Sequence, residues 1–303
     1  MTIMTDFQQK MTALLPSVKL LTNESMAKHT SFRIGGPAEV MAFPKNGEEL
    51  KEILKQSAFL DCKPAILGAG TNILAPDKGI FGLVICLKEC MDILEQVDDT
   101  HIRVGAGVSM ARAANFAANC GLSGLEFAHG IPGSVGGGVY MNAGAYGGEI
   151  CQVCQFVEVM DVNGRTRVLS AKDMDFAYRH SRLEVEGGIV LSATFALTPK
   201  SAEEIRATMQ DLIIRRRNSQ PLDLPSAGSA FKRPVGGYAA ALIDQTGLKG
   251  YQVGGAAISE KHAGFAVNLG GATAADVQEL LRQVSDIVFD KSGIRLEPEV
   301  RIW

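Results

Sequence analysis

The chain has 303 residues, of which 46% are hydrophobic and 21% are charged, and its formal net charge is −3. This composition is typical of a soluble globular protein built from two or three modules. The slight negative charge excludes a general attraction to nucleic acid or to an anionic membrane. The sequence contains no apolar run of about 18 residues and no secretory signal pattern, so we expect a cytoplasmic protein without membrane insertion.

The six cysteines lie mostly within apolar runs, which predicts buried, reduced thiols in a cytosolic protein. Cys151 and Cys154 are the only pair with the spacing of a redox or metal site. Because no second pair and no ligand histidine lies nearby, we interpret this pair as structural and predict no metal site.

The first part of the chain, residues 1–88, is predicted to be a small strand-helix-strand unit behind a leading helix over residues 1–22. Strands are expected at Glu39–Phe43, Pro64–Leu67 and Leu83–Leu87. The segment 47–58 has apolar residues at helical spacing and predicts an amphipathic helix between the first two strands.

A second part, residues 89–200, is predicted to be rich in hairpins. Ile93–Val97 and His101–Val104 form one expected hairpin, and a small-residue helix follows at about 108–119. Phe156–Val162 and Arg165–Leu169 flank Asn163-Gly164, a strong hairpin signal. A further strand is expected at Ile189–Leu197.

A third part, residues 201–303, is predicted to open with a helix over Ala202–Arg217. Helices are also expected at 237–245 and 273–289, the latter capped by Thr273, with strands near 253–258, 263–268 and 294–302. Alternation in the last strand places Leu296, Val300 and Ile302 on one face and Glu297, Glu299 and Arg301 on the other. Pro298 puts this strand at an edge or against a bulge.

A first glycine-rich loop, Gly68-Ala69-Gly70-Thr71-Asn72, follows a predicted strand. The third glycine and the helix of a Rossmann dinucleotide fingerprint are missing, which disfavours that fold. Two interpretations stay open for this loop alone: a tight structural turn, and a loop whose amides face a pyrophosphate.

A second glycine-rich segment is more specific, because eight glycines fall between Gly130 and Gly148. Most structural loops need only one or two special backbone positions. This density predicts a backbone that lies flat against a ligand. Since bare amides in such loops bind phosphate oxygens, the two segments together predict one long, phosphate-bearing ligand.

Ser229 follows a glycine in Ser226–Lys232, and from spacing alone it is interpreted as a turn residue. No Gly-x-Ser-x-Gly motif or triad order supports a hydrolase, and the histidines form no metal-ligand pattern.

Taken together, these residues resemble one known family, the UDP-N-acetylenolpyruvoylglucosamine reductases, over nearly the whole chain from about Lys28 to Trp303. The chain resembles the shorter subtype, because it lacks the insertion with a substrate-gripping tyrosine between the Arg179 and Ser229 regions. The resembling segments are His29–Ala38, Gly68–Asn72, Gly130–Gly137, Met141–Gly147, Tyr178–Ser181, Gly228–Phe231, His262–Phe265 and Glu299–Arg301.

The resemblance implies an α+β fold. Two FAD-binding subdomains of the vanillyl-alcohol-oxidase type, residues 1–88 and 89–200, would clamp non-covalent FAD, and residues 201–303 would form an α+β substrate-binding domain. It also implies an activity in peptidoglycan precursor synthesis: the NADPH-dependent reduction of UDP-N-acetylglucosamine-enolpyruvate to UDP-N-acetylmuramate. Hydride would pass from FAD to C3 of the enolpyruvyl group, and a proton from Ser229 to C2.

The same resemblance implies roles for individual residues. Ser229 would be the general acid, with Arg179 and Glu299 beside it. The substrate would be bound by Arg233, Lys232, Arg301 and Tyr178. The cofactor would be bound by Gly68, Ala69, Gly70, Thr71, Asn72, Gly130, Ile131, Pro132, Gly133, Ser134, Gly136, Gly137, Asn142, Ala143 and Gly144.

Two other functions stay open at this point. One is an oxidase of the vanillyl-alcohol-oxidase type, although no histidine that could attach flavin covalently lies between Gly68 and Gly79. The other is a non-catalytic module that binds a nucleotide with the same loops.

Overall fold

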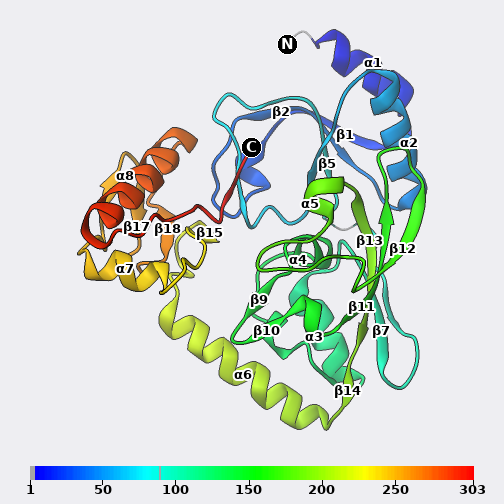
Figure 1. Cartoon of the computed structure of the whole chain (residues 1–303). Coiled ribbons are helices and arrows are strands. Elements are labelled where there is room, and N and C mark those ends of the chain that lie inside the picture. The colour runs from blue at the N-terminus through cyan, green and yellow to red at the C-terminus, as the bar shows by residue number, and fades with distance from the viewer. Residues whose placement is uncertain (1–3, 89) are drawn as a thin grey trace. The chain divides into compact units, whose positions relative to one another are not determined.

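A computed structural model describes residues 4–88 and 90–303 of the chain (Figure 1). These residues group into two compact units that alternate along the sequence. Unit 1 comprises the residues up to Thr22, Val40–Ala69 and Gly82–Arg215, and unit 2 comprises Asn23–Glu39, Gly70–Phe81 and Arg216–Trp303. The division into three domains after residues 88 and 200 remains a prediction. None of the helices in the described residues has the length and apolar character that crossing a membrane requires.

The larger sheet of unit 1 has five antiparallel strands (Figure 1). Both predicted hairpins are confirmed within it, and Gly164 adopts φ +75° in the second turn. The strand order is β12 (Thr166–Ser170), β11 (Cys154–Met160), β13 (Ile189–Ala196), β7 (His101–Gly105) and β6 (Leu94–Gln96).

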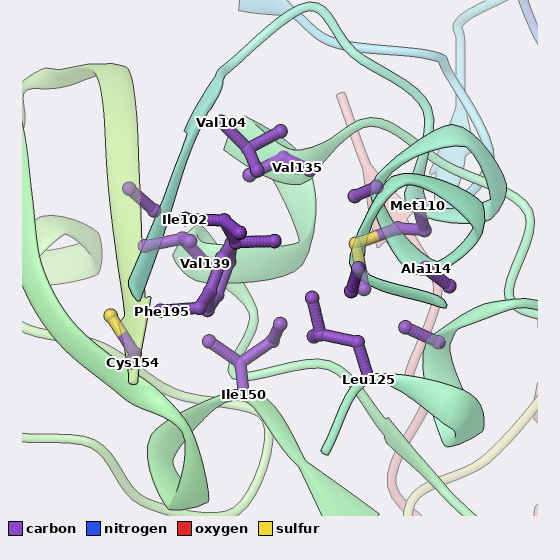
Figure 2. Close-up of a cluster of buried hydrophobic side chains, with 14 of the residues drawn as sticks. Ile102, Val104, Met110, Ala114, Leu125, Val135, Val139, Ile150, Cys154 and Phe195 are labelled. Atoms are coloured by element: carbon purple, nitrogen blue, oxygen red, sulfur yellow. The ribbon is translucent and has the colours of Figure 1, made fainter. Parts of the chain in front are cut away.

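Two helices, α3 (Met110–Asn119) and α4 (Val135–Tyr140), pack in the core of this part of unit 1. Figure 2 shows Val135 and Val139 of α4 among Ile102 and Phe195 of the sheet, with Met110 of α3 nearby. The sequence did not predict α4, because its three consecutive glycines are poor helix formers. Burial of its two valines supplies the stability that local propensity lacks.

The second sheet has the order β1 (Lys19–Ser25), β2 (Pro37–Phe43), β5 (Ile80–Cys86) and β3 (Ala65–Leu67). Helices α1 (Asp6–Leu14) and α2 (Gly47–Phe59) contribute Met11, Leu50 and Ile53 to a core that includes Leu191 of β13. The predicted helix over residues 1–22 was too long, since Pro16 disfavours helical geometry at Leu15 and β1 follows. Residues 1–3 of that prediction lie outside the described residues.

Unit 2 contains a four-stranded antiparallel sheet next to two helices, α7 (Ala239–Gln245) and α8 (Ala274–Ser292) (Figure 1). Its strand order is β15 (Ser226–Ser229), β18 (Phe265–Asn268), β17 (Ala256–Ile258) and β16 (Gln252–Val253). The predicted strand 253–258 was wrong as a single strand. Gly254, at φ +53°, turns the chain and makes a hairpin of it.

The predicted strand 294–302 is reduced to β19 (Arg301–Ile302), which pairs in parallel with β4 (Ile73–Leu74). Leu296 and Val300 are buried as predicted, but the side of Ile302 was wrong, because this residue is 46% exposed. The segment changes partner: Glu299 donates to Ala230, whereas Arg301 donates to Asn72. A change of partner breaks the simple alternation of faces.

The remaining elements of the described chain are the long helix α6 (Ala202–Ser219) and several short ones: α5 (Leu183–Glu186), β8 (Leu122–Ser123), β9 (Gly144–Ala145), β10 (Gly148–Glu149), β14 (Thr198–Pro199) and single 3₁₀ turns at Met26–Lys28, Glu126–Ala128 and Ile150–Gln152.

Candidate flavin and substrate site

The start of the first glycine-rich segment lies against the second segment in unit 1. A Cβ atom added to Gly68 would lie 2.9 Å from Ser134 Oγ and 4.0 Å from the amide nitrogen of Gly137. Ser134 is the N-cap residue of α4, and its hydroxyl accepts a long hydrogen bond of 3.4 Å from Gly137. The start of the first segment and the beginning of α4 in the second segment therefore lie side by side in this unit.

Several main-chain amides of the two glycine-rich segments have no protein acceptor within the described residues: those of Gly68, Ala69, Gly130, Gly133 and Ser134. Ser134 is 4% exposed, and the other four residues are half-buried. A buried amide requires a hydrogen-bond partner, and groups of this kind bind phosphate oxygens well. These residues therefore fit the diphosphate of a dinucleotide cofactor.

Other predicted cofactor amides are already used by the protein itself. Those of Ile131, Gly136, Asn142 and Ala143 donate to backbone carbonyls, and Pro132 has no amide hydrogen. These residues would have to contact a cofactor through other atoms.

Part of the glycine density has a packing cause rather than a ligand. A Cβ atom on Gly136 would lie 2.9 Å from the Cβ of Ala106, and one on Gly138 would lie 2.8 Å from the sulfur of Met110. One on Gly148 would lie 2.5 Å from the Phe127 ring. The inference that the whole segment lies flat against a ligand was therefore too broad.

Asn142 joins this segment to the next one in unit 1. Its side chain donates to Glu149 Oε2 at 3.1 Å and to the carbonyl of Ala177 at 3.0 Å, and it accepts from the amide of Cys151 at 2.9 Å. The residue is 1% exposed and adopts φ +42°. Its amide group thus fixes the position of the turn that begins at Ala177.

This turn carries Tyr178 and Arg179 at its tip. Ala177 and His180 exchange backbone hydrogen bonds of 3.2 and 3.1 Å, and buried Ser181 donates to the carbonyl of Tyr140 at 2.7 Å. Arg179 adopts φ +56°, an uncommon conformation for a residue with a side chain. Its Nη2 atom lies 3.5 Å from the carbonyl of Gly144. The guanidinium is therefore held beside the second glycine-rich segment.

In unit 2, Ser229 ends β15 opposite Phe265 of β18. The register of this pair shifts between Ser226 and Ser229, and Gly228 in between adopts φ +79°. Bulges of this kind re-aim side chains and are frequent next to active sites. The following residue, Ala230, donates to the carbonyl of Gly264 at 2.8 Å and accepts from the amide of Glu299 at 3.0 Å.

The same series of hydrogen bonds continues to the first glycine-rich loop. The side chain of Asn72 donates to the carbonyl of Glu299 at 3.2 Å, and its own carbonyl accepts from the amide of Arg301 at 3.0 Å. Gly70 has to be glycine, because its φ is +66° and a Cβ atom would lie 1.9 Å from the carbonyl oxygen of His29. Unit 2 therefore brings Ser229, Glu299, Arg301 and Asn72 onto adjacent backbone segments.

Two basic residues follow Ser229 in the chain. Lys232 forms an ion pair with Glu297, and the guanidinium carbon of Arg233 lies 4.1 Å from the centroid of the Tyr238 ring. Tyr238 is 62% exposed. Lys232 and Arg233 thus belong to the same unit as Arg301, whereas Tyr178, the other predicted substrate residue, belongs to unit 1.

Sequence reasoning gave no role to two histidines near these segments. His129 precedes Gly130, its Nδ1 atom is buried with no partner in the described residues, and burial lowers its pKa. His262 accepts a hydrogen bond from the amide of Gly264, whose carbonyl accepts from Ala230, and its place in the motif His262–Phe265 did not reveal these contacts.

The Cys151–Cys154 pair keeps its structural interpretation. Burial raises the pKa of Cys154 to about 12, and it also raises the pKa of Cys151. Both thiols are free in the structure. A raised pKa disfavours the thiolate that redox or metal chemistry requires.

Comparison with known proteins agrees with these features. Residues 38–170 match the family model of an FAD binding domain, and residues 220–303 match the model described as the C-terminal domain of UDP-N-acetylenolpyruvoylglucosamine reductase. The chain is therefore a flavoprotein oxidoreductase with an α+β FAD-binding fold and a separate C-terminal domain, as predicted.

Similar proteins define the family. Two enzymes named UDP-N-acetylenolpyruvoylglucosamine reductase, from Agathobacter rectalis and Caldanaerobacter subterraneus, are each 46% identical to this chain. The alignments cover 98% and 97% of this chain and 98% and 96% of the relatives. A solved reductase of this name from Thermus caldophilus superposes with a TM-score of 0.79 at 37% identity, covering 94% of this chain and 98% of that chain.

The chain belongs to the UDP-N-acetylenolpyruvoylglucosamine reductase family. It is an FAD oxidoreductase of peptidoglycan precursor synthesis that acts on UDP-N-acetylenolpyruvoylglucosamine, with NADPH as co-substrate. The predicted family, fold class, enzyme class and cofactor are confirmed. The reductase function of this family is favoured over the two alternative functions, an oxidase of the vanillyl-alcohol-oxidase type and a non-catalytic nucleotide-binding module.

Proposed function

We propose that this chain reduces the enolpyruvyl ether of UDP-N-acetylglucosamine-enolpyruvate to the lactyl ether of UDP-N-acetylmuramate, with Ser229, Arg179 and Glu299 as its catalytic residues. One observation carries the assignment. In unit 2, consecutive hydrogen bonds link the segments of Ser229, Glu299 and Asn72. This link supports the proposal that Ser229 acts as the general acid with Glu299 near it.

FAD would be held by main-chain groups rather than by charged side chains. The amides of Gly68, Ala69, Gly130, Gly133 and Ser134 support this proposal, because they have no acceptor in the described protein. When bound, the flavin supplies the hydride chemistry, and the protein supplies position and electrostatics.

Arg179 would hold the substrate carboxylate. Hydride addition at C3 places negative charge on C2 and on that carboxylate, so a guanidinium there stabilises the enolate-like species. The hydrogen bonds of Asn142 and Ser181 support this role, because they fix both sides of the turn that carries Arg179.

Ser229 would deliver a proton to C2. A hydroxyl is a weak acid, but an enolate carbon is a strong enough base for a positioned donor. Glu299 would orient its neighbours, or donate a hydrogen bond to the carboxylate when protonated. The bulge before Ser229 supports a directed side chain at this position.

The substrate diphosphate requires local cations, because the chain as a whole is slightly negative. Arg301, Lys232 and Arg233 are our candidates in unit 2, and Tyr178 is our candidate in unit 1. Lys232 would have to exchange its partner Glu297 for a phosphate.

A cytoplasmic location also remains a prediction, supported by six free cysteines.

A Ser229→Ala variant tests this assignment when the two half-reactions are followed separately by rapid mixing. NADPH should still reduce the enzyme-bound flavin at the wild-type rate, because that step needs no proton from Ser229. Reoxidation by the enolpyruvyl substrate should slow by at least about 100-fold. An equal loss of both half-reactions would refute the role of Ser229.

A further inference from the structure

We propose that His262 is a positioning residue for Ser229: its Nδ1 atom holds the turn whose Gly264 carbonyl fixes the peptide next to Ser229. This inference rests on the proposed role of Ser229. It concerns a residue that has no part in the cofactor or substrate contacts proposed above.

The first line of evidence is a two-step series of hydrogen bonds. The amide of Gly264 donates to His262 Nδ1 at 3.1 Å. The carbonyl of the same Gly264 accepts from the amide of Ala230 at 2.8 Å. Because Ala230 is bonded directly to Ser229, a displacement of the Gly264 peptide would be transmitted to the general acid.

The imidazole also packs against the strand opposite Ser229. The rings of His262 and Phe265 meet edge to face, with centroids 5.1 Å apart and an interplanar angle of 78°. Phe265 is the residue that pairs with Ser229 between β18 and β15. His262 therefore supports Ser229 from two directions, through Gly264 and through Phe265.

The turn itself leaves little freedom around the imidazole. A Cβ atom on Gly264 would lie 3.0 Å from His262 Cε1, 3.1 Å from its Nδ1 and 3.1 Å from the Cβ of Ala240 in α7. The backbone amide of His262 donates to Ser259 Oγ at 3.3 Å. Gly264 is thus packed between the imidazole and Ala240 of α7, which suits a fixed acceptor better than a mobile proton carrier.

The role requires an Nδ1 atom without a proton. Burial has the largest effect on the pKa of His262 and lowers it. A hydrogen bond with the residue's own backbone raises this pKa, Lys249 lowers it and Asp244 raises it, and the net shift is downward. Asp244 and Lys249 form an ion pair of 2.9 Å with each other. The neutral ring is therefore expected near neutral pH, and the hydrogen bond from the Gly264 amide to Nδ1 then leaves the proton on Nε2.

Two substitutions of His262 distinguish the contribution of its hydrogen-bond acceptor from that of its aromatic ring. His262→Phe keeps an aromatic ring against Phe265 but removes the acceptor. His262→Asn loses the ring but places a carbonyl oxygen near the position of Nδ1, where it can accept from the amide two residues on.

We expect reoxidation of the reduced flavin by the UDP-sugar to slow by about 10- to 100-fold in His262→Phe, the scale of a small misplacement of a reacting group. Flavin reduction by NADPH should be unchanged. His262→Asn should restore most of the rate. Amide hydrogen exchange should be faster in residues 226–232 of His262→Phe alone.

Equal behaviour of the two variants would overturn the proposal, and so would an equal slowing of both half-reactions in His262→Phe. If that variant does not fold, ¹⁵N spectra of the wild-type imidazole decide the question. An unprotonated Nδ1 agrees with the proposal, and a proton on Nδ1 contradicts it. A wild-type enzyme whose flavin the UDP-sugar does not reoxidise would refute the proposed function instead, and the spectra do not depend on turnover.

Discussion

Asn142 illustrates how a residue near a cofactor can act through the fold. The family resemblance implies that it is a cofactor ligand, yet its side chain forms hydrogen bonds with Glu149, Ala177 and Cys151. A buried amide that satisfies three backbone or side-chain groups is costly to replace, because each group would be left without a partner. We therefore expect its effect on catalysis to pass through the turn of Arg179.

An Asn142→Asp variant should show this effect. The new carboxylate cannot donate to Glu149 or to the Ala177 carbonyl, and it would be repelled by both. We expect a loss of about 1–3 kcal/mol in the free energy of unfolding, measured by denaturant titration, together with slower substrate reduction.

Asn163→Asp is the matched control for this variant. Asn163 is exposed in the hairpin turn before Gly164, where asparagine and aspartate are both favoured. This control should leave stability within about 0.5 kcal/mol of the wild type. If Asn142→Asp were as stable as the control, the inference that the Asn142 side chain fixes the turn of Arg179 would be wrong.

At the scale of elements, local signals predicted most of the regular structure. The capped helix α8 begins one residue after Thr273 as expected, and the Asn163-Gly164 turn joins β11 to β12. What the sequence did not predict depends on contacts between distant residues. Helix α4 has glycines where propensity predicts a loop, and the C-terminal segment changes its partner from Ala230 to Asn72.

The first turn of α8 can be tested through the pH dependence of the protein's stability. Hydrogen bonds from the amides of Thr273 and Gly255 lower the pKa of Asp276. A carboxyl group with a lowered folded-state pKa stabilises the protein above its unfolded pKa, and this contribution is lost as pH falls through the folded pKa.

We therefore expect Asp276→Asn to be less stable than the wild type at neutral pH, as measured by urea unfolding. The difference between the two proteins should shrink as the pH falls below about 4, the ordinary pKa of an aspartate. A stability difference that stays constant down to strongly acidic pH would show that Asp276 does not act through its charge.

For the whole molecule, the candidate site could be predicted only as a set of segments. Glycine density pointed to a phosphate-bearing ligand, but composition could not separate the glycines that face a ligand from Gly136 and Gly138, which make room for Ala106 and Met110. The roles of Ser229, Arg179 and Glu299 came from family resemblance. The spacing of Ser229 alone indicated a turn, because its partners lie far away in the sequence.

The most direct test of the account follows the colour of the purified protein under anaerobic conditions. We predict that the protein binds FAD and is yellow, that NADPH bleaches it, and that UDP-N-acetylglucosamine-enolpyruvate then restores the colour while UDP-N-acetylmuramate forms. A protein that stays colourless after incubation with FAD, or a reduced flavin that the UDP-sugar leaves bleached, would contradict the account.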